Sequence, residues 1–234
     1  MIREELIKKS PLRTFEASVH GMTAAGKLGV VAAPKGVGKT ACLVQLAIDR
    51  LLQQKAIIHV SYASRVDYIL TWYEDIYQEL ARSLGLEFDR DIYEEVVKHR
   101  VVMNFSQEGM RTDHVLPSLE AMMVHGKPGV ETVIVDGYNF IDSPAQDLQK
   151  FKDFAWRMRK EVWISASLRG EEPLFDERGR PRELERYLEA IDILVTLRYH
   201  DRRVWLHVVK DMDYPPAGEL GISLDPATLL MARL

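Results

Sequence analysis

The stretch VVAAPKGVGKTACLVQL, residues 30–46, reads as a buried strand, a turn that contains glycine, and the first turns of a helix. Within it, residues 33–40 match the template G-x-x-x-x-G-K-[ST], except that alanine replaces the first glycine. Gly36 and Gly38 let the backbone turn so that its N–H groups point inward. The helix that we expect to begin near Lys39 adds the partial positive charge of its N-terminus. The stretch therefore predicts a loop that binds phosphate groups.

The side chains of this loop indicate which phosphate compound it binds. Lys39 supplies a positive charge for β- and γ-phosphates, and Thr40 places a hydroxyl on a magnesium ion, so we expect ATP and Mg2+ as ligands. The predicted nucleotide contacts are Ala33, Pro34, Lys35, Gly36, Val37, Gly38, Lys39, Thr40 and Ala41. The alternative is a glycine-rich turn with an incidental Lys-Thr pair. It is less favoured because a strand precedes the loop and an amphipathic helix follows it.

A second motif, ETVIVDGYN at residues 131–139, ends a run of apolar residues with Asp136. A phosphate loop of this kind needs a carboxylate beyond the tip of a neighbouring strand, where it holds magnesium through water. An acid that emerges from a buried strand is costly unless it has a cation or hydrogen bonds. We therefore expect Asp136 and Thr40 to share the metal site. The alternative is that Asp136 caps the loop that follows it.

The composition is that of a globular chain of one domain. The chain has 234 residues, of which 47% are hydrophobic and 28% charged, with a formal net charge of -4. This length fits a single domain, and we assign residues 1–234 to it. A weakly acidic chain is not a general binder of polyanions, so binding of nucleic acid would need a local basic face.

Cysteine content and apolar runs bear on the location of the protein. Cys42 is the only cysteine, which excludes a disulfide framework and a cysteine metal site within one chain, and we expect it to be buried. No apolar run reaches the roughly 18–20 residues that span a bilayer. The first residues, MIREELIKKSPLRTFE, lack the apolar region of a secretory signal. We expect a cytoplasmic protein with no membrane partner.

Short apolar runs alternate with amphipathic segments, which is typical of an α/β fold with a mostly parallel central sheet flanked by helices. Near the end, IDILVTLRYHDRRVWLHVVKD predicts an antiparallel C-terminal hairpin. The expected strands are 28–32, 56–61, 100–104, 132–136, 162–165, 193–197 and 204–209, with short additions in GELGIS and LLMARL. The expected helices are 39–54, 65–83, 112–125, 144–159 and 182–190. We treat residues 1–20 as an N-terminal arm and residues 170–182 as an exposed, mobile loop.

Taken together, these motifs resemble the RecA-like P-loop ATPases, and in particular the DnaB-type helicase core and the KaiC-like proteins. The resemblance runs from about Ser10 to Leu230. It rests on the segments GKLGVVAAPKGVGKTACLVQLA, AIIHVSYASRVDYI, VIVDGYNFI, EVWISASLRG and AIDILVTLRYHDRRVWLHVVKDMDYPPAGELGISLDPAT. The resemblance implies a nucleotide bound between subunits that assemble head to tail, in a ring or a filament.

The sequence departs from this family's pattern at its catalytic positions. The family has a water-activating glutamate at the tip of the second strand, where this chain has Ala63 or Ser64. It has a glutamine at the sensor position, which matches Ser167 here. Helicases have a Lys-x-Arg pair that contacts the neighbouring subunit's nucleotide, and this chain keeps Lys210 but has Met212 in place of the arginine. Because such an arginine is worth orders of magnitude in rate, the changes imply ATP binding with slow hydrolysis.

Other polar residues could replace the missing groups. Gln107 and Glu108 follow the third expected strand, and Arg198, Arg202 and Arg203 flank the hairpin. Each is more often a surface or turn residue, so we assign none of them a role. The predicted catalytic residues are Lys39, Asp136, the sensor Ser167, and Lys210 as a contact to a neighbouring subunit.

The resemblance also locates the loops that would hold single-stranded DNA, at about 138–147 and 169–182. The first loop, YNFIDSPAQD, has no basic residue, and the second has as many acidic as basic side chains. A strand-binding groove needs uncancelled positive charge, so nucleic acid is not the partner that we favour. Tyr138 and Phe140 could stack on bases, but aromatic residues at this place are more often packed inside the domain.

The segment VDYILTWYEDIYQELARSLGL is rich in aromatic residues. Tyr68, Trp72 and Tyr73 fall near one stripe of the expected helix, and Tyr77 follows them. We expect this stripe to pack on the sheet. The alternative is a docking surface for another subunit or another protein.

The function that the sequence favours is a slow or partner-activated ATPase with a regulatory or assembly role. In this hypothesis the nucleotide sets the shape of the loop 170–182, and so the affinity for a protein partner. The first alternative is a DNA-dependent ATPase of the helicase or recombination-accessory type. The second is a small-molecule phosphotransferase with 178–186 as an arginine-rich lid, against which the C-terminal hairpin and the GELGISLDP tail argue.

Overall fold

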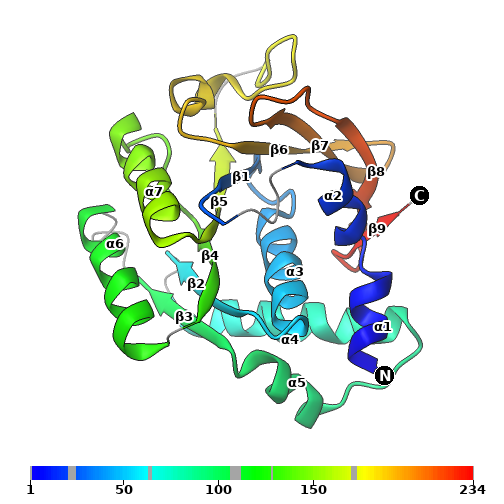
Figure 1. Cartoon of the computed structure of the whole chain (residues 1–234). Helices are drawn as coiled ribbons and strands as arrows, with labels where there is room; N and C mark the ends of the chain where they lie inside the picture. Colours follow the sequence, from blue (N-terminus) through cyan, green and yellow to red (C-terminus); the bar gives the residue numbers. More distant parts are fainter. Residues whose placement is uncertain are drawn as a thin grey trace.

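The computed structural model describes residues 2–20, 25–62, 65–105, 112–127, 129–169 and 173–233. Within them the strands form one sheet in the order β3-β2-β4-β5-β1-β6-β7-β8-β9 (Figure 1). The strands are β1 (Leu28–Pro34), β2 (Ala56–Ser61), β3 (Arg100–Asn104), β4 (Val130–Asp136), β5 (Glu161–Leu168), β6 (Ile193–His200), β7 (Arg203–Asp211), β8 (Gly218–Leu224) and β9 (Met231–Arg233). The helices are α1 (Ile2–Lys9), α2 (Leu12–Ser18), α3 (Lys39–Leu52), α4 (Val66–Ser83), α5 (Arg90–Val97), α6 (Thr112–Ala121), the π-helical turn η2 (Met122–Gly126), α7 (Ala145–Met158) and the 3-10 helix η3 (Arg182–Tyr187).

The sheet has a parallel part and an antiparallel extension. β1 pairs in parallel with β5 and β6, β2 with β3 and β4, and β4 with β5. From β6 onward, the pairs with β7, β8 and β9 are antiparallel. β1 and β2 are buried along almost their whole length, as expected of parallel strands that are covered on both faces. The predicted fold class, including the C-terminal hairpin, is therefore confirmed.

Helices cover both faces of the parallel part (Figure 1). On β1, Val31 and Ala33 belong to the apolar cluster that contains α1 to α5, whereas Val30 and Ala32 belong to the cluster that contains α6 and α7. Successive side chains of a strand point to opposite faces, so this alternation fixes β1 between two cores. The end of β1 is thereby held in place, and the loop that follows it starts from a rigid support.

Most predicted helices are present with small shifts at their ends. The segments expected at 39–54, 65–83 and 144–159 are α3, α4 and α7. The segment expected at 112–125 is α6 continued by a π-helical turn, and that at 182–190 is the shorter η3. In the described part of the chain, no helix is both long enough and apolar enough to cross a bilayer.

Residues 2–18, which lie in the expected N-terminal arm, form α1 and α2 and pack against the α3 face of the sheet. Leu6, Leu12 and Phe15 are buried in the same cluster as α3. The Phe15 ring lies on Trp163 of β5, with ring centroids 6.0 Å apart. The N-terminal segment is therefore part of the core that supports the sheet.

α5 was not among the predicted helices. Its N-cap residue, Asp89, accepts hydrogen bonds from the amides of Asp91 and Ile92, which would otherwise lack partners at the helix start. Tyr93 and Val96 are buried on its inner face. The helix has only enough length for these two anchors, so its apolar period is too short to stand out in the sequence.

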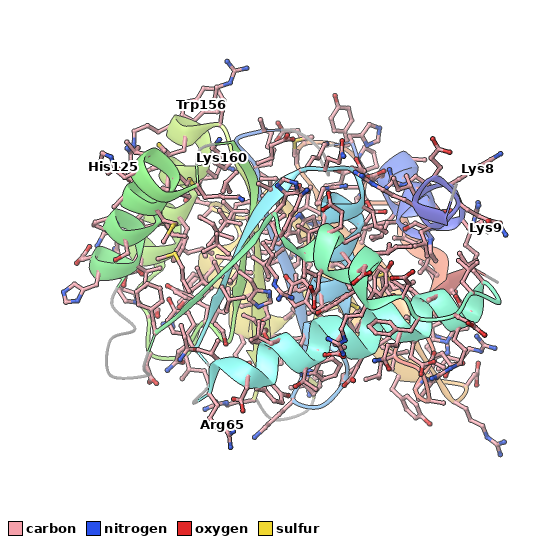
Figure 2. The ribbon with its side chains drawn as sticks, turned by 90° about the horizontal axis from the view of Figure 1, so that it is seen from below. Lys8, Lys9, Arg65, His125, Trp156 and Lys160 are labelled. Atoms are coloured by element: carbon pink, nitrogen blue, oxygen red, sulfur yellow. The ribbon has the colours of Figure 1, made fainter. Side chains whose placement is uncertain are left out.

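The aromatic stripe of α4 is divided between the core and the surface. Ile69, Tyr73 and Tyr77 are buried, whereas Tyr68 is 53% exposed and meets Trp72 edge to face. The prediction that Tyr68 packs on the sheet is therefore wrong, because the inward face of the helix lies one residue further along. The N-terminal end of α4 lies at the surface, where Arg65 is labelled in Figure 2.

The described part of the expected mobile loop, residues 173–182, is closed by hydrogen bonds; residues 170–172 lie outside the described residues. Asp176 accepts hydrogen bonds from the amides of Arg178 and Arg180 and pairs with the Arg180 guanidinium. From β6, Arg198 donates to the Gly179 carbonyl at 2.6 Å and lies over the Phe175 ring at 4.5 Å. This part of the loop is thus fastened to the antiparallel extension.

A buried ion network ties α2, α3 and β5 together. Arg50 is 1% exposed, and its guanidinium donates to both carboxylate oxygens of Glu161 at 3.0 and 3.1 Å. It also donates to Glu16 at 2.6 Å and to Asp49 at 3.3 Å. Thr132 of β4 donates to the same Glu161 carboxylate at 2.8 Å. The network therefore fixes helix α3 against the amino-terminal ends of two strands.

Arg50→Ala should lower the free energy of unfolding by about 3–5 kcal/mol, because it leaves buried carboxylates without their cation. The matched control is Arg82→Ala, which removes an arginine with a 69% exposed side chain that pairs with Glu79. It should change the free energy of unfolding by less than about 1 kcal/mol. Urea unfolding followed by circular dichroism measures both values. Equal losses in the two variants would contradict the structural role of the buried network.

Candidate nucleotide-binding site

The sheet order brings the two predicted motifs to one edge. β5 lies between β1 and β4, and its Ser165 is level with Val31 of β1. The phosphate loop follows β1 and Asp136 ends β4, so both emerge at the carboxyl edge of the parallel strands. The chain leaves this edge through α3 on one face and α7 on the other (Figure 1). Such a crossover point is where open α/β sheets bind ligands.

The loop between β1 and α3 is shaped by two glycines. Gly36 has a φ of 84° and Gly38 a φ of 112°, conformations that residues with a side chain rarely adopt. Gly38 is the N-cap of α3, and the first bond of the helix runs from Cys42 N to the Gly38 carbonyl at 3.0 Å. The amides of the first helical turn therefore have no partner within the helix and are available to an anion.

Lys39 is folded back over this loop. Its side chain is buried, and Nζ donates to the Ala33 carbonyl at 3.0 Å and to the Pro34 carbonyl at 2.8 Å. Burial lowers the pKa of Lys39 to about 8, and the nearby Asp136 carboxylate opposes part of this shift. The ammonium thus lies above the start of the loop, and only neutral carbonyls accept its hydrogen bonds.

Asp136 joins three elements by hydrogen bonds. The Thr40 hydroxyl of α3 donates to Oδ2 at 2.8 Å, and the Ser165 hydroxyl of β5 donates to Oδ1 at 2.7 Å. The Ser165 oxygen in turn accepts a hydrogen bond from the Gly137 amide at 2.8 Å. The structure therefore brings together Lys39, Thr40 and Asp136, as the sequence predicted.

Ser165 is a member of this site that sequence reasoning missed. Its residue type is common, and the segment WISAS offers two serines on the same face of the strand. Register with the neighbouring strands decides between them, because Ser165 is placed beside the carboxylate of Asp136. Ser167 lies two residues further on and is the register partner of Ala33, where the phosphate loop begins.

Ala33 shows why the first glycine of the template is dispensable here. The residue lies within β1, pairs with Ser167, and is fully buried. Its methyl group packs in the α3 cluster, so a side chain fits at this position. The backbone leaves the strand conformation only after Pro34, and the glycines that the turn requires are the two that follow.

The donor set fits magnesium and a triphosphate. A hydroxyl and a carboxylate are hard oxygen groups of the kind that Mg2+ prefers, and Thr40 and Asp136 supply them side by side. An ammonium and a set of unpaired helix amides favour phosphate oxygens. Thr40 would hold the metal directly and Asp136 would hold it through water. Cys42 takes no part, because it is buried and burial raises the pKa of its thiol to about 12.

Lys210 lies at the opposite edge of the sheet. Its partner on β6 is Leu194, which is level with Val30 near the start of β1. Pro34, at the end of β1, is about 13 Å further along the strand, and the phosphate loop lies beyond it. The Lys210 ammonium donates to two backbone carbonyls that precede β6. Lys210 and the neighbouring Met212 therefore do not belong to the site formed by their own chain.

The other predicted substitutes do not gather at the phosphate loop. Arg198 is directed to Gly179, and Arg203 donates to the Ser223 hydroxyl of β8 at 3.2 Å. Arg202 lies in the turn between β6 and β7. The remaining positions, Ala63, Ser64, Gln107 and Glu108, lie outside the described residues.

The described residues of the two loops expected to contact DNA are engaged within the domain. Tyr138 and Phe140 are 4% and 6% exposed and pack edge to face, which confirms that they serve packing. Arg186 donates to carbonyls of the loop after β4, including that of Phe140. Arg180 is paired with Asp176. These arginines stabilise the loops from within.

A groove of about 630 Å³ lies away from this site, between α4 and the turn that follows β8. Tyr68 and Trp72 line one wall and Ala227 to Leu229 the other. Acidic side chains at its rim, among them Asp75 and Glu79, make it unsuitable for a phosphate compound.

The two loop glycines give a matched test of this geometry. A Cβ at Gly36 would meet no atom within 4 Å, whereas a Cβ at Gly38 would overlap the buried Leu224 side chain of β8. Each alanine substitution should cost about 1–2 kcal/mol of backbone strain. Gly38→Ala should cost roughly 1 kcal/mol more in the free energy of unfolding, because of overpacking. In a Leu224→Ala background this extra cost should disappear. Equal costs in the two backgrounds would show that β8 does not press on the loop.

Comparison with known proteins bears on the fold. No protein-family model matches the chain, and no curated protein matches its sequence. Among solved structures, 435 chains match. One of them is the ATPase domain of a DnaB-like helicase, with a TM-score of 0.67, 14% sequence identity, and coverage of 90% of this chain and 86% of that chain. At this identity the likeness concerns the fold alone. The described residues have the fold of a RecA-like ATPase domain.

Proposed function

We propose that this protein binds ATP with Mg2+ at the carboxyl edge of its sheet. The observation that carries the proposal is the convergence of Lys39 with the hydrogen-bonded Thr40 and Asp136 around a helix start with unpaired amides. The lysine and the amides would bind phosphate oxygens, and Thr40 and Asp136 would hold the metal. Ser165 keeps the carboxylate oriented through its hydrogen bond.

We further propose that hydrolysis is slow, or that it depends on a partner. A carboxylate that activates water raises the rate of such reactions, and the matching sequence positions carry Ala63 and Ser64. Asp67, the acid nearest in sequence, is held by Arg65 at the exposed start of α4. The site is then complete for binding, but it lacks a general base from these positions.

The position of Lys210 supports a site that a neighbouring subunit completes. Because Lys210 lies at the edge opposite the loop of its own chain, the only nucleotide it could contact is one held by another copy. Head-to-tail stacking brings opposite edges of successive subunits together. In that arrangement Lys210 would exchange its carbonyl partners for a phosphate, while Met212 would contribute no charge.

A regulatory or assembly role follows from these features. A nucleotide that is bound and not consumed quickly acts as a signal, because it stabilises one arrangement of the loops around it. The described part of the loop 170–182 is fastened to β6 through Arg198, and β6 is a neighbour of β1 in the sheet. We propose that nucleotide state is read out through this loop by a protein partner or another copy.

The two alternatives have less support. A DNA-dependent motor would need basic and aromatic groups turned outward, whereas Arg180 and Arg186 are engaged within the loops and Tyr138 is buried. A phosphotransferase would need arginines of the segment 178–186 as a lid over the phosphates. Arg186 holds the loop after β4 in place instead.

The first test measures binding of labelled ATP with Mg2+. Lys39→Ala should weaken binding at least about tenfold, because it removes the buried ammonium from the phosphates. Lys35→Ala removes the same charge from the same loop, but its side chain is exposed, so it should weaken binding far less. Equal binding by wild type and Lys39→Ala would refute the proposed site.

Phosphate release then separates the functional alternatives. Release should be near zero at low protein concentration and rise with concentration if a neighbouring subunit completes the site. Stimulation by single-stranded DNA would favour the motor, and phosphate transfer to an acceptor other than water would favour the phosphotransferase. Lys39→Ala is the blank in each assay.

The low pKa of Lys39 gives a pH dependence with a defined sign. Burial disfavours the charged ammonium, so the free protein loses this proton as the pH rises through about 8. Bound phosphates favour the charged form, and ATP binding above about pH 8 should therefore take up a proton and weaken as the pH rises. Calorimetry in two buffers that differ in ionisation enthalpy measures the uptake. Lys35→Ala should retain it, and identical heats in both buffers would contradict the prediction.

A further inference from the structure

The antiparallel extension carries a polar cluster on the face of the sheet that points away from α3. Val204 and Leu206 of β7 pack in the α3 cluster, so His207 projects from the other face. Glu219 of β8 is its cross-strand register partner, and His200 is the last residue of β6. The three side chains thus come from three successive strands, and the proposed nucleotide site uses none of them.

The ligand atoms of these side chains converge on one point. Glu219 Oε2 lies 3.6 Å from His207 Nε2 and 3.7 Å from His200 Nε2, and the three atoms lie within 4.8 Å of one another. These separations exceed a normal hydrogen bond of about 2.7–3.2 Å. They match the spacing of two ligands that share one ion at about 2.0–2.2 Å from each. The spacing therefore suits a metal ion better than direct hydrogen bonding.

His207 supplies a second, independent observation. Its Nε2 atom is buried and has no hydrogen-bond partner among the described residues, although it faces the Glu219 carboxylate. A buried polar atom without a partner costs free energy unless a ligand satisfies it. The residue itself is only half-buried at the surface of the extension, so an ion can reach it from solvent.

His200 is oriented for metal binding by its neighbours. Its ring stacks on Trp205 with centroids 5.1 Å apart and planes 9° from parallel. Its other nitrogen, Nδ1, lies 3.3 Å from Asp201 Oδ2. A carboxylate on the far ring nitrogen is the usual support of a metal-bound histidine, because it fixes the ring and directs Nε2 to the ion.

The charges around the cluster permit a divalent cation. Glu219 and Asp201 contribute two carboxylates, and Arg198 is the nearby cation that acts on His207. The Arg198 guanidinium donates to the Gly179 carbonyl and lies over the Phe175 ring, so it is held on the other side of the hairpin surface by its own partners. Two carboxylates against one guanidinium leave a local excess of negative charge for the ion.

We propose that His200, His207 and Glu219 form a binding site for Zn2+. Two imidazoles and one carboxylate are a zinc donor set, and three protein ligands leave the fourth position to water or to a group of another molecule. By linking β6, β7 and β8, the ion stabilises the antiparallel extension against separation of its strands. Binding to the folded state alone raises its stability with metal concentration.

The experiment uses the full chain without a histidine tag and titrates it with zinc chloride in a calorimeter. The expected result is one Zn2+ per chain and a midpoint of thermal unfolding that rises with added zinc. His207→Ala and Glu219→Gln should each lower the affinity at least about tenfold. Asp201→Asn, which removes the support of His200, should lower it by about tenfold.

The matched control is His125→Ala, which removes an exposed histidine in η2, beyond α6 and away from the extension (Figures 1 and 2). It should leave zinc binding unchanged. Circular dichroism without zinc checks that each variant folds, and Glu219→Gln is the informative variant if His207→Ala fails to fold, since Glu219 is exposed. Absence of a one-to-one phase, or equal binding by Glu219→Gln and wild type, would overturn the proposal.

Discussion

The hydrogen bonds of the Asp136 carboxylate are the constraint on which the geometry of the site depends. One oxygen is held by Thr40 and the other by Ser165, so the first turn of α3, the end of β4 and the middle of β5 are fixed relative to one another. A carboxylate at the end of a buried strand needs such partners, because burial without them is costly. The same bonds place a hydroxyl and a carboxylate together, and this pairing is what suits the site to a metal ion.

The phosphate loop is held from two further sides. From below, the Lys39 ammonium bonds the carbonyls at the end of β1, so that the lysine stays over the loop without a ligand. From the side, Leu224 of β8 lies where a Cβ of Gly38 would be. β8 belongs to the antiparallel extension, and its contact with the loop means that the extension and the nucleotide site share one packed surface. Only glycine fits at this contact.

The sequence predicted those features that repeat along the chain or depend on residue type. Buried parallel strands appear as apolar runs, and the lysine, threonine and aspartate of the site have few structural uses in that pattern. Ser165 was missed because its role is set by register with β4, which one strand alone does not reveal. Tyr68 was assigned to the wrong face because neighbouring positions of α4 carry aromatic residues on both sides of its boundary. α5 is too short to show an apolar period.

The direction of β7 determines what each end of that strand can contact. β7 runs antiparallel to β6, so its first residues lie at the edge where the phosphate loop emerges, level with Leu224. Its last residues, including Lys210, lie at the other edge. One strand therefore presents a packing contact to the nucleotide site of its own chain and a cation to the opposite side of the domain. A cation so placed can serve ATP chemistry only between two chains, and the missing arginine at Met212 weakens that contact without changing its direction.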